Sequence, residues 1–169
     1  MHKPLLTFPI RYIPFRLSKK DKSKQAQMIL KSKKLYKKGK YFTRKILKSF
    51  QSKQSPHITK ARKIYNIRNI VPSRELSSAT GCSIKTLKKI VNKGAGAYYS
   101  SGSRPNQTAQ SWGLARLASS ITGGKAAAVD YDLIENGCDH KKKAFILANK
   151  AREMYKYGHS KTHKVSIQK

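Results

Sequence analysis

The chain has 169 residues, of which 38 are Lys or Arg and 7 are Asp or Glu, so its formal net charge is +31 at pH 7. This length fits one modest domain with an arm or tail, and a hydrophobic content of 38% allows only a small core. Such a charge predicts a polyanionic neighbour and argues against a freely diffusing metabolic enzyme. The sequence contains no apolar run long enough to span a membrane, and prolines interrupt the N-terminal apolar stretch where a signal peptide would need continuity.

The positive charge is concentrated in the first half of the chain. Residues 1–74 hold 22 Lys and Arg but only one acid, whereas residues 75–169 hold 16 Lys and Arg and six acids. We therefore predict a basic extended arm over 1–72 with one or two helices, a helical domain over 73–158 and a basic tail over 159–169. Because β-rich runs are few, the predicted fold class is mainly α.

The first segment, residues 4–17, contains three prolines that disfavour a helix. Its apolar residues alternate with other residues, as in a strand-like segment with one apolar face. We expect an extended arm that docks along a neighbouring protein. Its predicted contact residues are Leu6, Phe8, Ile10, Tyr12 and Phe15.

Local signals predict the next helices. Ser18 resembles an N-cap with Asp21 completing a weak capping box, which predicts a helix over about 19–37 that Gly39 ends. Ser-Pro at 55–56 marks a turn, and residues 57–65 are predicted to form a short helix.

Aromatic residues alternate with the lysines of this region, a mixture that suits base stacking and phosphate contact. The alternative is that the aromatics dock the arm onto its own domain or onto a partner. The residues concerned are Tyr36, Tyr41, Phe42, Phe50 and Tyr65.

Residues 75–91 resemble a helix-turn-helix. Ser73 is predicted to cap a helix through Ala79 that Gly81 ends, and Ser83 to cap a second helix over 84–92 that Gly94 ends. In that geometry four residues of the second helix would meet the major groove or the phosphates. They are Lys85, Thr86, Lys88 and Lys89. The alternative is an ordinary αα-hairpin in the core.

Residues 94–107 are rich in Gly, Ser, Pro and Asn and are predicted to form a loop. One interpretation is a recognition surface, and the other is a self-packed loop with a tryptophan anchored in the core. The candidate recognition residues are Tyr98, Tyr99, Arg104, Asn106, Gln107, Trp112 and Arg116.

Three more helices are predicted towards the C-terminus. Thr108 would cap a helix over 109–121, Asp130 would open a short helix that Gly137 closes, and Asp139 would cap an amphipathic helix over 140–157.

No catalytic constellation is readable. Cys82 and Cys138 lie far apart in the sequence, which indicates no disulfide framework and favours a reducing compartment. Residues 121–125 are weakly similar to a phosphate-binding loop, but the motif's first glycine and its Mg²⁺-binding hydroxyl are both missing. Cys138 and the nearby histidines match no common zinc-finger spacing. We expect a non-enzymatic protein without cofactor, metal or small-molecule substrate.

One stretch carries a family resemblance. The sequence GAYYSSGSRPNQT, followed by SWGLARLAS and TGGK, over residues 96–125 resembles a family of short basic proteins of large double-stranded DNA viruses of eukaryotes. The preceding Thr-Gly turn and the Trp-x-x-Ala-Arg helix also resemble segments of some tailed-phage proteins. The similarity is strongest over 73–138, with a further match at 11–21. The resemblance implies a virion setting and supplies no activity.

Two functions follow from these observations. The first is a virion structural protein, a minor or internal capsid-associated component that contacts the major and other minor capsid proteins, with viral DNA or the anionic inner membrane as its polyanion. It would reside in the virion, and in the host cytoplasm during assembly. The second is a non-enzymatic protein that condenses or packages DNA through the hairpin and the lysine-rich arm.

Overall fold

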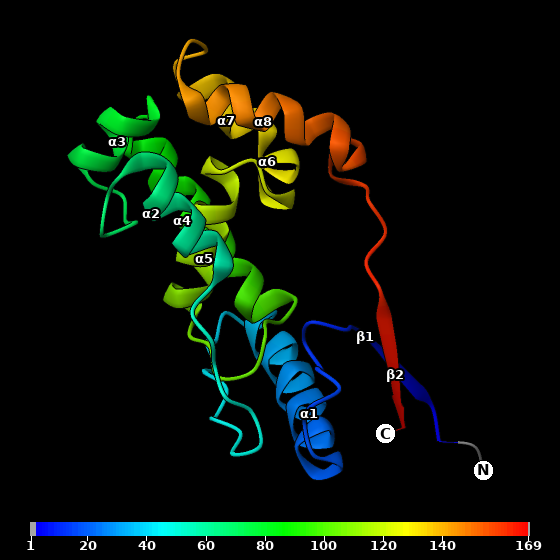
Figure 1. The fold of residues 1–169 in the computed structure, drawn as a ribbon. Helices are drawn as coiled ribbons and strands as arrows, with labels where there is room; N and C mark the ends of the chain where they lie inside the picture. Colours follow the sequence, from blue (N-terminus) through cyan, green and yellow to red (C-terminus); the bar gives the residue numbers. More distant parts are fainter. Residues whose placement is uncertain (1–2, 169) are drawn as a thin grey trace. The chain divides into compact units, whose positions relative to one another are not determined.

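The computed structural model describes residues 3–168 and is mainly helical, as predicted from the sequence. Its described residues form eight α-helices, one short 3-10 helix and one two-stranded sheet (Figure 1). The chain divides into two compact units. Unit 1 comprises Met1–Lys53, Gly96–Ala109 and Lys161–Lys169, and unit 2 comprises Gln54–Ala95 and Gln110–Ser160. The division differs from the predicted arm, domain and tail, because the first and last segments belong to one unit.

The N-terminal segment is part of unit 1 instead of a free arm. Strand β1, Leu5–Pro9, pairs antiparallel with strand β2, Lys164–Gln168, so that Phe8 lies opposite Val165 (Figure 1, blue and red). Phe8 is 3% exposed and Tyr12 is also buried. The predicted docking role is therefore wrong for these two residues, since this chain's own residues cover them.

Helix α1, Lys19–Tyr36, begins and ends where the sequence predicts. The hydroxyl of Ser18 accepts a hydrogen bond from the amide of Asp21 at 3.2 Å. At the other end, the amides of Gly39 and Lys40 donate to the carbonyls of Tyr36 and Leu35, with Gly39 at φ +71°. This pattern is a Schellman motif, in which glycine adopts the left-handed conformation at low cost.

The core of unit 1 includes a cluster in which α1 meets the segments on either side of it. Buried Leu17, Met28 and Leu47 pack together, and Phe42 and Phe50 cover them. Two of the aromatics that interleave the lysines thus serve the protein's own core.

Unit 2 is helical and is built around one larger core. Figure 1 shows its helices, among which α7 and α8 run beside each other. The helices are α2 (Pro56–Tyr65), α3 (Arg74–Thr80), α4 (Ile84–Ser100), α5 (Ala109–Ile121), α6 (Lys125–Val129), α7 (Tyr131–Gly137) and α8 (Lys143–Met154), followed by the 3-10 helix Lys156–Gly158. By their contacts, the last residues of α4 and the first of α5 belong to unit 1.

Helix α4 continues well past Gly94, the residue predicted to end it. A Cβ atom at Gly94 would lie 2.7 Å from the Cα of Gly113 in α5. The glycine therefore allows two helix backbones to approach closely and does not terminate the helix. The loop predicted over 94–107 is correspondingly shorter and begins after Ser100.

The C-terminal helices also differ from their predicted limits. Helix α6 is not predicted at all, and α8 begins at Lys143 instead of residue 140. Asp130 precedes α7 as predicted, but its side chain makes no capping hydrogen bond. Within residues 3–168, no helix has the length and apolar character needed to cross a membrane.

Candidate nucleic-acid interface

The hairpin of α3 and α4 forms through the predicted caps. The amide of Leu76 donates to the Ser73 hydroxyl at 3.1 Å, and Gly81 ends α3 at φ +79°. The amide of Thr86 donates to the Ser83 hydroxyl at 3.1 Å and so satisfies an amide at the start of α4. The two helices are thus connected by the short turn that a helix-turn-helix requires.

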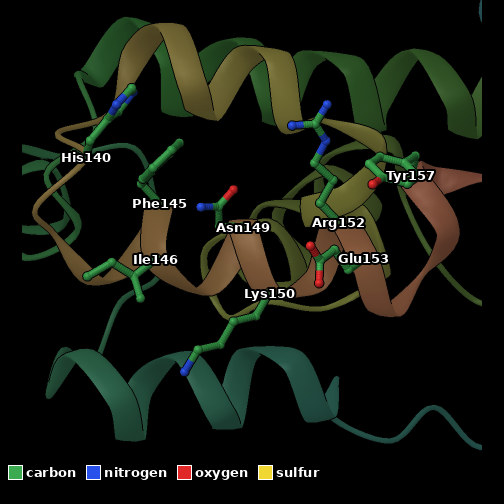
Figure 2. A pocket seen from close by; sticks show the side chains of 8 residues that line it. All are labelled: His140, Phe145, Ile146, Asn149, Lys150, Arg152, Glu153 and Tyr157. Atoms are coloured by element: carbon green, nitrogen blue, oxygen red, sulfur yellow. The ribbon is translucent and has the colours of Figure 1, made fainter.

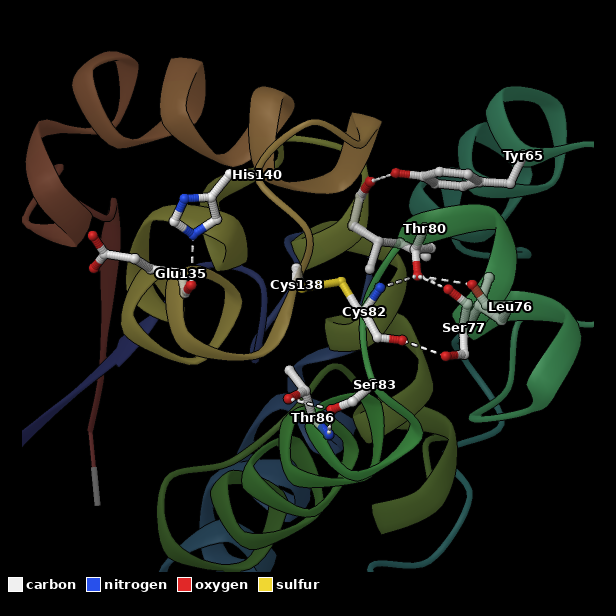
Figure 3. The surroundings of a disulfide bond; sticks show 11 residues. Tyr65, Leu76, Ser77, Thr80, Cys82, Ser83, Thr86, Glu135, Cys138 and His140 are labelled. Carbon is white, nitrogen blue, oxygen red and sulfur yellow. Dashed lines mark hydrogen bonds between the residues drawn. A yellow bond between two sulfur atoms is a disulfide. The ribbon is translucent and has the colours of Figure 1, made fainter.

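A disulfide links this turn to the end of α7, contrary to the expectation of two separate cysteines. Cys82 and Cys138 are bonded across 56 positions of sequence (Figure 3). The flanking backbone explains the pairing: the Ser83 amide donates to the Gly137 carbonyl at 2.9 Å, and the Asp139 amide to the Gly81 carbonyl at 2.8 Å. The two cysteines therefore face each other across an isolated antiparallel bridge, which the spacing in the sequence does not reveal.

Three of the four predicted nucleic-acid contacts on α4 are exposed. Lys85, Lys88 and Lys89 lie on the outer face of the helix, whereas Leu87 and Ile90 are fully buried on the other face. Thr86 is only 7% exposed, so the structure excludes it from this surface. Among the described residues, none of the three lysines forms an ion pair with a carboxylate.

Several residues predicted for the recognition surface of the glycine-rich segment make internal contacts instead. Tyr98 is fully buried, and the Asn106 side chain is occupied by Leu47 and Phe50, whose backbone it contacts at 2.7 to 3.3 Å. Tyr99 is half-buried, Arg104 is exposed and Gln107 is partly buried. Trp112 and Arg116 belong to unit 2, whereas the other five residues belong to unit 1. For Tyr98 and Asn106 the self-packed alternative is correct.

Arg116 forms an internal ion pair with Asp130. Its Nε and Nη2 atoms donate to the buried Asp130 carboxylate at 2.8 and 2.7 Å, and the Lys93 ammonium lies 3.0 Å from the same carboxylate. Burial opposes ionisation of Asp130, but the hydrogen bonds and charges of Arg116 and Lys93 outweigh it and lower the pKa of this carboxyl. An acid that follows the apolar run 126–129 is the sequence signal that indicates a buried, paired carboxylate.

Unit 1 carries a second basic surface, where the end of α1 and the following loop bring aromatic rings together. We name Tyr36, Tyr41, Tyr98 and Tyr99 the tyrosine cluster. The ring centroids of Tyr36 and Tyr99 lie 6.1 Å apart with nearly parallel planes, and Tyr41 lies 5.0 Å from Tyr99. The lysines exposed around it in the sequence are Lys34, Lys37, Lys38, Lys40 and Lys45.

Arg44 holds the buried member of the cluster, Tyr98, in place. Its guanidinium lies 3.8 Å from the Tyr98 ring centroid and donates to the Tyr98 carbonyl and to the hydroxyls of Ser32 and Ser103 at 2.8 to 3.1 Å. Burial lowers the pKa of Arg44, although an arginine stays protonated in proteins. This role of Arg44 is not among the predictions from the sequence. The sequence does contain a signal for it. Between Lys19 and Lys60, Arg44 is the one arginine among residues that carry a positive charge, and all the others are lysines.

The comparison with protein families places most of these features in one segment. A family model described as "Family of unknown function (DUF5824)" matches residues 9–137, more than half of the chain. The chain belongs to the DUF5824 family. No curated protein and no solved structure matches it. The DUF5824 segment contains the tyrosine cluster, Arg44 and the α3–α4 hairpin.

A surface depression on α8 lies beyond the DUF5824 segment. It has a volume of about 520 Å³ and is lined by α8 together with His140 and Tyr157 (Figure 2). The rings of His140 and Phe145 stack with their centroids 3.9 Å apart, and the Nε2 atom of His140 lies 2.7 Å from the Glu135 carbonyl oxygen. At the other end, the guanidinium of Arg152 lies over the Tyr157 ring. These contacts tie the start and end of α8 to their neighbours. Among residues 3–168, no group of three metal-ligating side chains occurs.

Proposed function

We propose that this DUF5824 protein binds duplex DNA without catalysing a reaction, and condenses or packages it. The observation that carries the proposal is the outer face of α4, where Lys85, Lys88 and Lys89 are exposed above a buried apolar face. The hairpin presents these ammonium groups on a rigid helix that both caps and a disulfide hold in place. The setting that we propose is the virion, and the polyanion that we propose is the viral genome. Both rest on the resemblance of residues 96–125 to proteins of large double-stranded DNA viruses.

The chemistry of this face favours recognition of the DNA backbone. Lysine ammonium groups contact phosphates as point charges, whereas base readout in the major groove uses bidentate Arg, Asn or Gln side chains. Before Asn92, the exposed side chains of α4 include lysines but no Arg, Asn or Gln. Binding is therefore expected to be independent of sequence and strongly dependent on salt, because each neutralised phosphate releases counterions.

Duplex affinity measured over a range of salt concentrations tests the proposal. We expect the triple variant Lys85→Gln, Lys88→Gln, Lys89→Gln to bind more weakly at every salt concentration. Its slope of log affinity against log salt should be smaller by about 3, since each lost phosphate contact lowers the slope by about 1.

A matched control removes the same charge elsewhere in unit 2. The variant Lys141→Gln, Lys142→Gln, Lys143→Gln neutralises three exposed lysines at the start of α8. It should retain more of the affinity and of the salt slope. Equal losses in the two triple variants would show that α4 has no special role, and wild-type binding that ignores salt would contradict DNA binding through phosphates.

A second candidate function, a minor capsid component, is supported by two exposed apolar side chains. Phe15 is 75% exposed and Ile10 is 42% exposed, although neighbouring residues of the same segment are buried. These two belong to the predicted docking residues, and they remain available to a capsid protein. The incorporation of Ile10 and Phe15 variants into virions tests this candidate.

A further inference from the structure

We infer that Tyr41 is a stacking site for an unpaired base of single-stranded nucleic acid. The site lies in unit 1, whereas the α4 lysines belong to unit 2, so it does not depend on the proposed duplex binding. It combines an exposed aromatic ring, a rigid aromatic support and a surrounding group of lysines. Those three features together are what sequence-independent single-strand binding uses.

The exposure of Tyr41 is unusual for a ring that belongs to an aromatic cluster. Tyr41 is 72% exposed, whereas Tyr98 is fully buried and Tyr99 is half-buried. The ring of Tyr41 contacts Tyr99 and Tyr36 at centroid distances of 5.0 and 6.1 Å, and most of its surface faces solvent. A large aromatic surface held in water in this way is available for stacking by a planar ligand.

The contacts that support Tyr41 form a chain through Tyr99 and Tyr98 to the buried guanidinium of Arg44. Tyr99 meets Tyr98 edge to face at 5.1 Å, and Arg44 covers Tyr98. The Arg44 amide also donates to the Tyr98 hydroxyl at 2.9 Å, which fixes the chain three residues after Tyr41. The ring is therefore held before a ligand arrives, and such preorganisation lowers the entropic cost of binding.

The charge around the ring selects an anionic ligand. Tyr36 and Tyr41 are separated by Lys37, Lys38, Gly39 and Lys40, and the Schellman turn at Gly39 returns the chain so that the two rings meet. The three lysines are exposed, and none forms an ion pair with a carboxylate among the described residues. Phosphates on either side of a stacked base would thus find ammonium groups close to it.

The loop that carries Tyr41 is also longer than a simple connection requires. Residues 37–55 form neither helix nor strand, and connections of this length are usually either functional loops or linkers. The loop is anchored at Arg44 and at Leu47, whose amide donates to Asn106 at 2.7 Å. Between the end of α1 and these anchors, Tyr41 is the exposed aromatic ring.

A single-stranded ligand fits these features better than a duplex. Bases inside a duplex are already stacked on both faces and offer Tyr41 no free π-surface, whereas every unpaired base does. A duplex would use the lysines alone, and the exposed ring would then contribute nothing to its affinity.

Fluorescence anisotropy with two labelled oligonucleotides separates stacking from charge. One probe is an oligothymidylate of about 15 nucleotides, within the site sizes of single-strand-binding domains. The other has the same length and charge but carries abasic sugars. We expect the full-length protein to bind the thymidylate probe more tightly than the abasic probe. Tyr41→Ala should weaken thymidylate binding by about 5-fold to 100-fold and leave abasic binding unchanged.

Two variants serve as controls. Tyr41→Phe keeps the ring and should bind as the wild type does, and Tyr157→Ala removes a similarly exposed tyrosine of unit 2 and should also have no effect. Equal affinity of the wild type for the two probes would overturn the inference, as would a Tyr41→Ala variant that binds thymidylate normally. Equal weakening of both probes would overturn it too, because it would show a loss of fold or charge. In each of these cases duplex binding by α4 would still be measurable and would stand or fall by itself.

Discussion

Asp130 shows how a single buried residue organises unit 2. Its two carboxylate oxygens accept hydrogen bonds from Arg116 and Ser120, and the carboxylate forms an ion pair with Lys93. The side chain is fully buried, and its pKa is lowered because Arg116 and Lys93 more than offset the burial that raises it. The carboxylate is thus an internal partner of the basic residues and is not available as a general acid or base at the surface.

At the residue scale, we predict that Asp130→Asn destabilises the protein by about 3–5 kcal/mol at pH 7, because Arg116 loses its buried partner. A carboxyl with a lowered folded pKa contributes stability above its unfolded pKa of about 3.9, and this contribution disappears as the pH falls through the folded value. The difference between wild type and variant should therefore shrink below about pH 4.

Urea unfolding followed by circular dichroism at several pH values measures this difference. The exposed neighbour Asp132 provides the control, since Asp132→Asn should change the free energy of unfolding by at most about 0.5 kcal/mol. A stability difference for Asp130→Asn that stays constant down to pH 2 would contradict the assignment.

At the scale of elements, α4 owes its length to packing and not to propensity. Gly94 and Gly96 both disfavour a helix by their intrinsic propensity, yet the helix runs through both. A Cβ atom at Gly94 would meet the Gly113 backbone, whereas one at Gly96 would meet only the Tyr36 hydroxyl at 3.7 Å, an ordinary contact. The two glycines therefore have different reasons to occur.

This difference predicts opposite effects for the same substitution. Gly94→Ala should destabilise the protein by about 1–2 kcal/mol, because overpacking against a backbone exceeds the helix propensity that alanine adds. Gly96→Ala should be neutral or stabilising by up to about 1 kcal/mol. Thermal unfolding of the two variants beside the wild type provides the comparison, and a shift of the same sign in both would refute the packing argument.

At the scale of the whole molecule, the charge is divided unequally between two units. Unit 1 holds 21 of the 38 basic residues and a single acid, Asp21, so it carries most of the net charge. The hydroxyl and amide of Ser49 hydrogen-bond to Asp21 and lower the pKa of its carboxyl. A unit with so few acids depends on apolar packing and on hydrogen bonds to uncharged acceptors, such as those that Arg44 donates, to hold itself together.

The N-terminal segment belongs to this unit, which changes how the capsid candidate is tested. Deleting residues 1–17 removes the buried side chains of Tyr12, Ile13 and Leu17 and one strand of the sheet, so we expect unit 1 to unfold. The double variant Ile10→Ser, Phe15→Ser changes only exposed side chains. It should stay folded and be depleted from virions, as mass spectrometry of purified particles would measure.

A double variant that enters virions as the wild type does would remove the support for the capsid candidate. The replacement of exposed Ile46, also 75% exposed, by Ser serves as the control and should not affect incorporation.

Much of the secondary structure was predictable because its signals are local. Ser18, Ser73 and Gly81 act as caps at the predicted positions, since a cap requires only its immediate neighbours in the chain. Of the candidate site, the exposed lysines of α4 were predictable from helical periodicity. Arg44 was not, because its partners Ser32, Tyr98 and Ser103 are brought to it by distant segments.

The sequence by itself determined the charge, the mainly helical class and the position of most helices, because composition and capping are properties of short stretches. The tertiary structure decided the rest. It paired Cys82 with Cys138, joined the first segment to the last as β1 and β2, and placed Gly94 in the middle of a helix. Each of these outcomes depends on residues far apart in the chain, whose proximity arises only when the apolar surfaces of the helices are buried together.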